Sequence, residues 1–143
     1  MREILFRGKR VNNGEWVYGY LTMCTDGSCY ITTEVERNVL RYVKGKPSYV
    51  FSRIEYEVDP KTVGQCTGLK DKNGVGIYEG DVIVSTYKDM GTDTGLVVFK
   101  GCGFKVEIPN VGDDELVDWK RYFDSIEVIG NIYENPELLK END

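Results

Sequence analysis

The sequence predicts a mainly β fold, arranged as a meander of short strands with a small closed or partly open barrel and one or two short helices near the C-terminus. Three observations support this class. Apolar residues occur in short or alternating runs, and turn-forming glycine, asparagine, aspartate and proline residues separate those runs. Helical spacing of apolar residues appears clearly only between residues 114 and 123.

The chain begins with a predicted β-hairpin. Ile4 and Phe6 alternate with polar neighbours, and Asn12-Asn13-Gly14 is a strong hairpin turn signal. The second strand should run from Glu15 to Met23. Its alternation predicts Trp16, Tyr18 and Tyr20 on one face and Val17, Gly19 and Leu21 on the other, so that both faces are partly covered.

The next segment is ambiguous between helix and strand. Val35, Val39 and Tyr42 fit a helical stripe, yet residues 39–43 also suit a strand, and we favour the strand. Residues 44–47 form a turn, and residues 49–58 are extended up to Pro60. One compact domain of residues 1–143 is expected, with a possible subdivision into an N-terminal β subdomain of residues 1–57 and a C-terminal one of residues 58–143.

The rest of the chain is organised around residues 58–84, where turn residues separate short strands. Asp71-Lys72-Asn73-Gly74 predicts a reversal. Strands are expected at 80–87, 96–100, 104–108 and 125–133, a helix at 114–123 with an acidic first turn, and a helical turn beginning with Asn135-Pro136.

Composition limits the class of protein. A chain of 143 residues with 41% hydrophobic content can bury a sizeable core, and its apolar runs are far shorter than the roughly 20 residues needed to span a bilayer. Charged residues interrupt the N-terminus too early for a signal-peptide core, so a cytoplasmic location is expected. Cys24, Cys29, Cys66 and Cys102 are then expected to be free thiols, because their spacing suits zinc poorly and the chain has no histidine.

Charge is distributed unevenly along the chain. Residues 1–112 carry 15 basic and 14 acidic residues, and residues 113–143 carry 3 and 10, so the net charges of +1 and −7 sum to the total of −6. This distribution does not favour nucleic-acid binding, which draws most of its affinity from clustered positive charge. A local exception is the first hairpin, where Arg7, Lys9, Arg10, Trp16 and Tyr18 combine basic and aromatic side chains of the kind that stack on exposed bases. Core packing explains the aromatic residues equally well.

Three long runs carry a resemblance to a known family: FRGKRVNNGEWVYGYL at 6–21, DPKTVGQCTGLKDKNGVGIYEGDVI at 59–83 and IGNIYENPELL at 129–139. Together they resemble the YopX-like family of bacteriophage and prophage proteins, chiefly from Gram-positive bacteria. The resemblance implies a phage-derived, cytoplasmic, β-rich protein with a small SH3-like barrel in the C-terminal half. It implies no activity, because the family has no established biochemical function. Cys66 occupies a position where the family usually has an aromatic residue, which predicts a local packing difference.

Other candidate sites have simpler structural explanations. Gly74, Gly76 and Gly80 do not have the spacing of a phosphate-binding loop, and the sequence after Asp71 lacks the ligands of a calcium loop. Four acidic residues could hold a hard cation but are better explained as a solvated helix start; they are Asp113, Asp114, Glu115 and Asp118. Glu79 and Asp81 should point to one side of a strand, which suits acid-base chemistry if they share a pocket, yet they are better read as polar residues at the start of a strand.

These observations lead to two main functional hypotheses, beside a third in which Glu79 and Asp81 act in an enzyme. The first is a non-enzymatic interaction protein or oligomeric structural module, with no catalytic residue, no cofactor and no metal. It is expected to self-associate and to contact an unknown phage or host protein, and no association with a membrane is expected. The alternative is a small β-barrel that binds nucleic acid through the basic and aromatic residues of the first hairpin.

Overall fold

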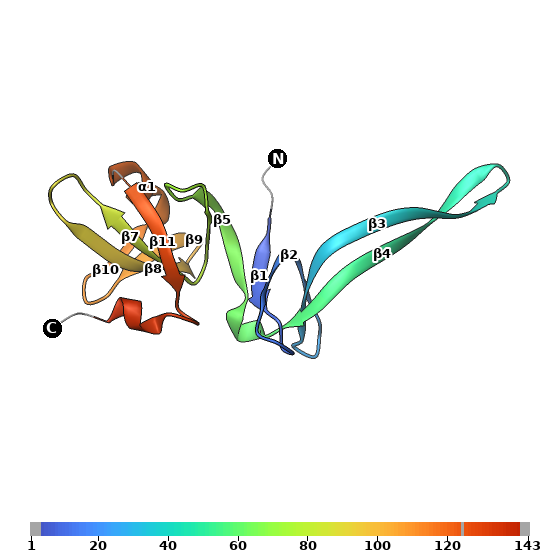
Figure 1. The fold of residues 1–143 in the computed structure, drawn as a ribbon, viewed down its shortest axis with the longest axis horizontal. Coiled ribbons are helices and arrows are strands. Elements are labelled where there is room, and N and C mark those ends of the chain that lie inside the picture. Colours follow the sequence, from blue (N-terminus) through green and yellow to red (C-terminus); the bar gives the residue numbers. More distant parts are fainter. Residues whose placement is uncertain (1–3, 124, 141–143) are drawn as a thin grey trace. The chain divides into compact units, whose positions relative to one another are not determined.

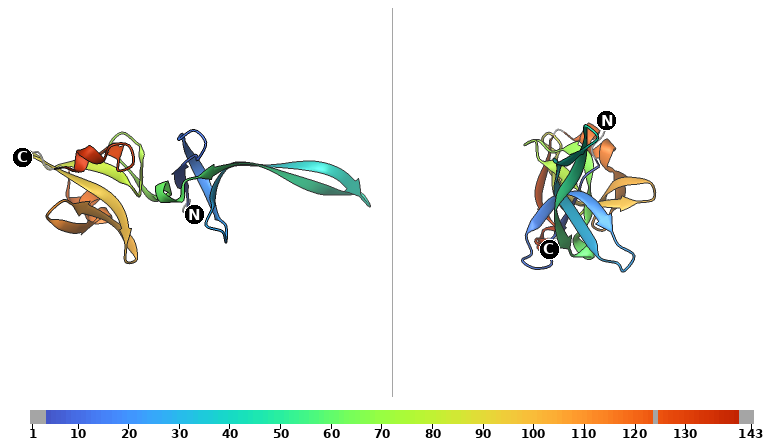
Figure 2. Two further views of the ribbon diagram at one scale, coloured as in Figure 1. Left: turned by 90° about the horizontal axis from the view of Figure 1, so that it is seen from below. Right: turned by 90° about the vertical axis from the view of Figure 1, so that its right-hand side faces the viewer.

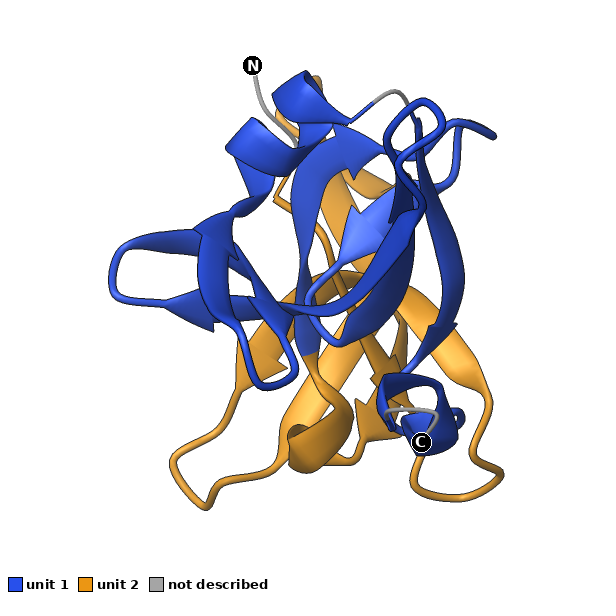
Figure 3. Cartoon of the chain, turned by 90° about the vertical axis from the view of Figure 1, so that its left-hand side faces the viewer, with its two compact units in different colours: residues 1–3, 64–143 blue, residues 4–63 orange. Residues whose placement is uncertain are grey.

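The structure is a computed structural model that describes residues 4–123 and 125–140 (Figure 1). It divides into two compact units at the bond between Val63 and Gly64, shown in different colours in Figure 3. We call residues 4–63 the N-terminal unit and the residues from 64 onward the C-terminal unit, and we describe each by itself. Residues 1–3, which contribute to the signal-peptide argument, lie outside the described part.

The N-terminal unit contains a four-stranded antiparallel sheet in the order β4-β3-β2-β1. Its elements are β1 (Phe6–Lys9), β2 (Trp16–Met23), β3 (Cys29–Val43), β4 (Lys46–Val58) and the short 3-10 helix η1 (Pro60–Thr62). The predicted hairpin is confirmed, because Phe6 pairs with Gly19 and Lys9 with Trp16. The ambiguous segment after Thr33 is strand, as favoured, and belongs to the long strand β3.

A small core lies on one face of this sheet. Cys29, Ile31 and Val58 are buried at its centre, with Phe6 and Val17 among the apolar side chains packed around them. After β4, η1 contacts β1: the hydroxyl of the buried Thr62 accepts a 2.9 Å hydrogen bond from the backbone N–H of Lys9. Buried residues of β3 end at Thr32, so the remainder of β3 and most of β4 extend beyond this core.

That extension is a two-stranded ribbon, which we call the arm and define as residues 33–57. It is the long hairpin of β3 and β4 in Figures 1 and 2, and its strands pair from Glu34 opposite Ile54 to Val43 opposite Lys46. Lys44 and Gly45 form the connecting turn, both with positive φ (49° and 77°). This conformation suits a tight hairpin between twisted strands.

The C-terminal unit contains a five-stranded antiparallel sheet in the order β10-β9-β8-β7-β11. Its elements are β5 (Gly64–Lys70), β6 (Gly76–Tyr78), β7 (Asp81–Thr86), β8 (Thr92–Lys100), β9 (Gly103–Ile108), β10 (Gly112–Glu115), α1 (Leu116–Tyr122), β11 (Ser125–Asn131) and the 3-10 helix η2 (Pro136–Leu139). A meander of four strands is followed by a fifth that returns beside the first, which is the connectivity expected of an SH3-like unit. Among the described residues β10 and β11 do not pair with each other, so the sheet is open and does not form a closed barrel.

The predicted helix begins later than expected. Asp113, Asp114 and Glu115 are not its first turn but belong to β10, which pairs with β9, and α1 starts at Leu116. Pairing with a neighbouring strand therefore outweighs the favourable placement of acids at a helix N-terminus. The apolar stripe is confirmed: Leu116 and Trp119 are buried in the core with Ile77, Ile83, Val97, Val106 and Ile126.

Candidate functional site

The first hairpin brings four of the five proposed nucleic-acid residues to one face of the N-terminal sheet. Arg7 lies opposite Tyr18 and Lys9 opposite Trp16, so all four side chains belong to the same set of alternating positions. The Arg7 guanidinium lies 4.7 Å and the Lys9 ammonium 5.7 Å from the centre of the Trp16 ring. Such distances are typical of cation-π contacts.

This face is not the one that packs into the core. The intervening residues Phe6, Val17 and Leu21 contact the buried cluster, which leaves the aromatic residues of β2 on the opposite side. Tyr18 and the next residue of the row, Tyr20, are 50% and 60% exposed, whereas Arg7 is buried. The rings of this row, rather than the Arg7 guanidinium, are therefore the accessible part of the surface.

Arg10 lies apart from the other four residues. The strand ends at Lys9, and the Arg10 guanidinium lies 4.2 Å from the centre of the Tyr56 ring and 3.8 Å from a carboxylate oxygen of Glu15. Tyr56 pairs with the core residue Ile31 and so belongs to the other set of positions. The sequence places Arg10 near the basic cluster, but the pairing continues through Arg10, which bridges Val58, so strand alternation sends its side chain to the face opposite Arg7 and Lys9.

The arm is the largest functional candidate, and sequence reasoning did not single it out. Nine large apolar side chains along it are between 41% and 70% exposed: Val35, Val39, Leu40, Tyr42, Val43, Tyr49, Val50, Phe51 and Ile54. Two-stranded ribbons without an underlying core are marginally stable in water, and exposed apolar patches are typical of interaction surfaces, which makes the arm a candidate. Its sequence fits both a helical stripe and a strand, and neither pattern tells whether the segment is covered by the rest of the protein.

Cross-strand pairing fixes which arm residues share a face. Val35 opposes Arg53, Arg37 opposes Phe51 and Val39 opposes Tyr49, and this set forms one face of the ribbon. The Arg37 guanidinium lies 4.5 Å from the centre of the Tyr49 ring. Residues Arg37 to Arg53 include five basic residues and no acidic one, although the whole chain carries a net charge of −6.

The carboxylates of Glu79 and Asp81, considered above for acid-base chemistry, both accept hydrogen bonds from backbone N–H groups. The Asp81 carboxylate is buried and accepts a 2.7 Å hydrogen bond from the backbone N–H of Tyr78. Glu79 accepts a 3.3 Å hydrogen bond from the backbone N–H of Gln65. These contacts connect β5, β6 and β7, and they account for both acids structurally.

Each of the acidic residues just before α1 contacts a different partner. Asp113 lies 3.1 Å from the Lys100 ammonium, and Glu115 lies 3.5 Å from the Lys105 ammonium. Asp114 accepts a 3.1 Å hydrogen bond from the Trp119 indole N–H. The hydrogen bond from Lys100 to Glu107 and, to a smaller extent, the one to Asp113 raise the pKa of Lys100. In the described part of the chain, no group of three or more potential ligands could hold a metal ion.

Asp71 is the titratable residue most closely integrated into the C-terminal unit. Its buried carboxylate accepts backbone hydrogen bonds from Asn73 (2.8 Å), Val75 (2.9 Å) and Val128 (3.1 Å), which join the predicted turn to β11. Burial acts to raise the pKa of Asp71, but the N–H groups of Val128, Val75 and Asn73, with help from the Lys120 charge, lower it below its ordinary value of 3.8. This is a structural role, because every contact is to backbone or to a distant charge.

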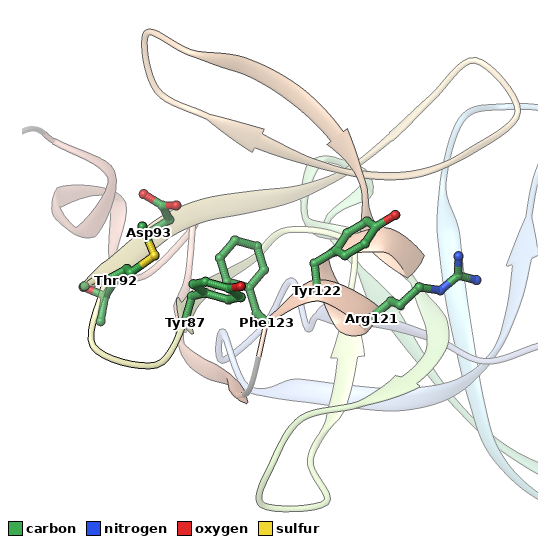
Figure 4. A pocket seen from close by; sticks show the side chains of 8 residues that line it. Tyr87, Thr92, Asp93, Arg121, Tyr122 and Phe123 are labelled. Atoms are coloured by element: carbon green, nitrogen blue, oxygen red, sulfur yellow. The ribbon is translucent and has the colours of Figure 1, made fainter.

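A hollow of about 530 Å³ lies in the C-terminal unit between the loop after β7 and the end of α1 (Figure 4). Tyr87 and Phe123 pack edge to face within it, with ring centres 6.2 Å apart, and the side chain of Arg121 points away from them. The lining of the hollow combines three aromatic rings with polar and charged side chains, which include Asp93 and Arg121.

The cysteines and the helices bear on two further expectations. All four cysteines are free thiols, and Cys66 is half-buried in β5 opposite Tyr78. Within residues 4–123 and 125–140, no helix has the length and apolar character needed to cross a membrane.

Comparison with known proteins supports the resemblance noted in the sequence. The family model described as "YopX protein" matches residues 5–140. Two solved structures are similar in fold: protein EF1440 from Enterococcus faecalis, with a TM-score of 0.64, 24% identity and coverage of 98% of this chain and 100% of that one, and protein yopX from Bacillus subtilis, with a TM-score of 0.57, 22% identity and coverage of 97% and 98%. No curated protein matches the chain. With a family model that spans nearly its whole length, the chain belongs to the YopX family.

Proposed function

We propose that the protein is a non-enzymatic interaction module of phage or prophage origin that acts in the bacterial cytoplasm and self-associates through the arm. The observation that supports this most is the arm itself, which exposes nine large apolar side chains beyond the core of its unit. Burying such a side chain contributes about 1.5 to 3 kcal/mol, so a chain that left all nine in water would forgo a large stabilisation. A partner surface that covers the arm supplies it.

The contacts of the acidic residues in the C-terminal unit support this role. The acidic residues that could have formed a catalytic pair, Glu79 and Asp81, accept backbone hydrogen bonds, and the buried Asp71 does the same. A binding protein needs a stable scaffold and an exposed surface, and these residues serve the scaffold.

Sedimentation velocity over a wide range of protein concentrations tests self-association. The variant Val39→Ser/Phe51→Ser removes two apolar side chains from one face of the arm, which are 48% and 59% exposed. If both are buried on association, the dissociation constant should rise about 100-fold or more, since each loss is worth ~1.5 kcal/mol or more and 1.4 kcal/mol is a factor of ten.

The matched control is Val111→Ser, which changes an equally apolar residue that is 78% exposed outside the arm. This variant should associate like the natural chain. A natural chain that remains monomeric at the highest concentration would refute the proposal, as would an arm variant that associates normally.

A second candidate function is nucleic-acid binding by the aromatic face of the first hairpin. The observation that favours it is that Lys9, Trp16, Tyr18 and Tyr20 share the face opposite the core, with both tyrosine rings at least half exposed. Stacking on such rings is a common way to bind unpaired bases.

Fluorescence anisotropy with a labelled single-stranded oligonucleotide tests this candidate. We expect salt-sensitive binding that Tyr18→Ser/Tyr20→Ser weakens at least tenfold, because base stacking on an aromatic ring is worth about 1 to 3 kcal/mol. The control Tyr122→Ser removes a 64% exposed ring from the C-terminal unit and should have no effect. Absence of salt-sensitive binding by the natural chain rules the candidate out.

A further inference from the structure

The two halves of the arm carry opposite charge. From the rung formed by Glu36 and Ser52 towards the core, the arm holds four acidic residues and one basic one, a net charge of −3; they are Glu34, Glu36, Glu55, Glu57 and Arg53. From the next rung, Arg37 with Phe51, to the turn it holds four basic residues and no acidic one, a net charge of +4; they are Arg37, Arg41, Lys44 and Lys46. We call these halves the base and the tip.

The arm has no strand partner along most of its length. Strand β2 pairs with β3 only as far as Thr32, and β4 is the edge strand of the N-terminal sheet. The outer edge of β4 is paired only at its base, where the carbonyl of Glu57 accepts a hydrogen bond from the backbone N–H of Val11. Among the described residues of this unit, the backbone edges of the arm nearer the turn have no strand partner, and both faces of the arm carry exposed apolar side chains. Such a ribbon presents apolar contacts and hydrogen-bonding groups to an incoming chain.

A second copy of the arm matches this surface in one orientation. When two arms lie antiparallel, the tip of each lies along the base of the other, so that a charge of +4 meets −3 twice. The middle of the arm, around Val35, Val39 and Phe51, then meets its own copy around a two-fold axis, where apolar contacts are self-complementary. A parallel arrangement places tip against tip and base against base, which is repulsive at both ends.

Nucleic acid fits the arm less well. The basic tip would attract phosphate groups, and a two-stranded ribbon can enter a major groove. The acidic base would repel the same phosphates, however, and the apolar side chains on both faces would remain in water. The segregation of charge into two halves of opposite sign favours an occupant with the same two halves.

We infer that two copies of the chain associate by antiparallel pairing of their arms about a two-fold axis, with the basic tip of each arm against the acidic base of the other. This inference rests on the proposed self-association and specifies its geometry. Exposed charges contribute modestly to the strength of an interface, but they determine which orientation is allowed.

Two complementary variants test the geometry. In the tip variant, Arg37→Glu/Arg41→Glu/Lys46→Glu, the tip charge changes from +4 to −2 and the base remains at −3. In the base variant, Glu34→Lys/Glu36→Lys, the base charge changes from −3 to +1 and the tip remains at +4. Each variant alone brings like charges together at both ends of the antiparallel dimer.

An equimolar mixture of the two variants has a different outcome. The acidic tip of one then meets the basic base of the other, and the unchanged base of the first meets the unchanged tip of the second. Sedimentation velocity at low salt should show at least tenfold weaker association for each variant alone and recovery of the dimer in the mixture. Far-UV circular dichroism checks that both variants are folded, and Lys61→Glu, an exposed charge reversal in η1, is the control.

The outcomes separate the geometry from the proposed function. Recovery of the dimer in the mixture supports antiparallel arms. If the natural chain associates but the variants associate equally well, or the mixture stays dissociated, the geometry is wrong while self-association stands. A natural chain that is monomeric at all concentrations overturns both. Binding of a labelled DNA duplex that the tip variant loses, without any dimer of the natural chain, identifies nucleic acid as the occupant and overturns the inference.

Discussion

Replacing Asp71 by alanine should destabilise the C-terminal unit by about 3 kcal/mol. The carboxylate is buried and accepts three backbone N–H groups, two within its own turn and one from Val128 in β11. The N–H of the half-buried Val128 loses its acceptor, which costs about 1 to 3 kcal/mol. Asn73 and Val75 are exposed, so water can replace their acceptor and each lost bond costs about 0.5 to 1 kcal/mol.

Asp71→Asn gives a graded comparison. The amide oxygen can still accept the two hydrogen bonds of the turn, but the amide nitrogen replaces the oxygen that faces the Val128 N–H. Two donors then face each other, and a loss of about 1 to 2 kcal/mol is expected, smaller than for alanine.

Urea denaturation followed by tryptophan fluorescence measures this loss. Trp119 is 2% exposed in the core of the C-terminal unit, so a Trp16→Phe background makes the signal report on that unit alone. With a slope of about 1.5 kcal/mol per molar urea, a loss of 3 kcal/mol lowers the unfolding midpoint by ~2 M. The control is Asp89→Ala, because Asp89 is an exposed aspartate in the loop after β7 of the same unit. The reasoning fails if Asp71→Ala and Asp89→Ala shift the midpoint equally.

Two further predictions concern the same unit. Because the folded-state pKa of Asp71 is lowered below 3.8, the stability that its charge contributes is fully present above pH ~4 and is lost as the pH falls through the folded-state pKa. The difference in unfolding free energy between the natural chain and Asp71→Asn should therefore shrink below pH ~4. A difference that stays constant with pH would contradict this role of Asp71. Gly95→Ala should destabilise the unit by about 1 to 3 kcal/mol, since an added Cβ would overlap Val106 and lie 3.4 Å from the Trp119 ring. The control is Gly76→Ala, whose added Cβ has its nearest neighbour at 3.6 Å and should change the unfolding free energy by less than ~0.5 kcal/mol. The same urea titration measures both.

Local patterns in the sequence were sufficient to predict most strands and turns. The Asn-Gly turn fixed the first hairpin, and strict alternation placed Trp16, Tyr18 and Tyr20 on one face, because both signals depend on residues that are neighbours in the chain. The helix start was wrong because the pairing of β10 with β9 is a contact between separate segments, which no helical pattern reveals.

The arm shows a different limit of sequence reasoning. Val39 and Phe51 stand beside the apolar residues Leu40 and Val50, as residues of a covered strand often do, and nothing local indicates that no core lies beneath them. The sequence shows that residues 37–53 include basic and no acidic residues, with acidic residues on either side of them. Only the register, which sets Arg37 opposite Phe51, shows which of these charges lie in the same half of the arm. Arg10 was grouped with the basic residues of the hairpin because it is their neighbour in the chain, although alternation from Arg7 and Lys9 puts residue 10 on the opposite face.

The Lys44-Gly45 turn has a consequence for how the arm gains order. Every rung of the arm joins residues connected through this one turn, so the ribbon can form from its tip inwards and can open again without disturbing either core. Regions with few buried contacts open at a free-energy cost well below that of global unfolding. The protein thus combines two units that each have a buried core with an arm that has none, and a partner that covered the arm would prolong the time for which its strands stay paired.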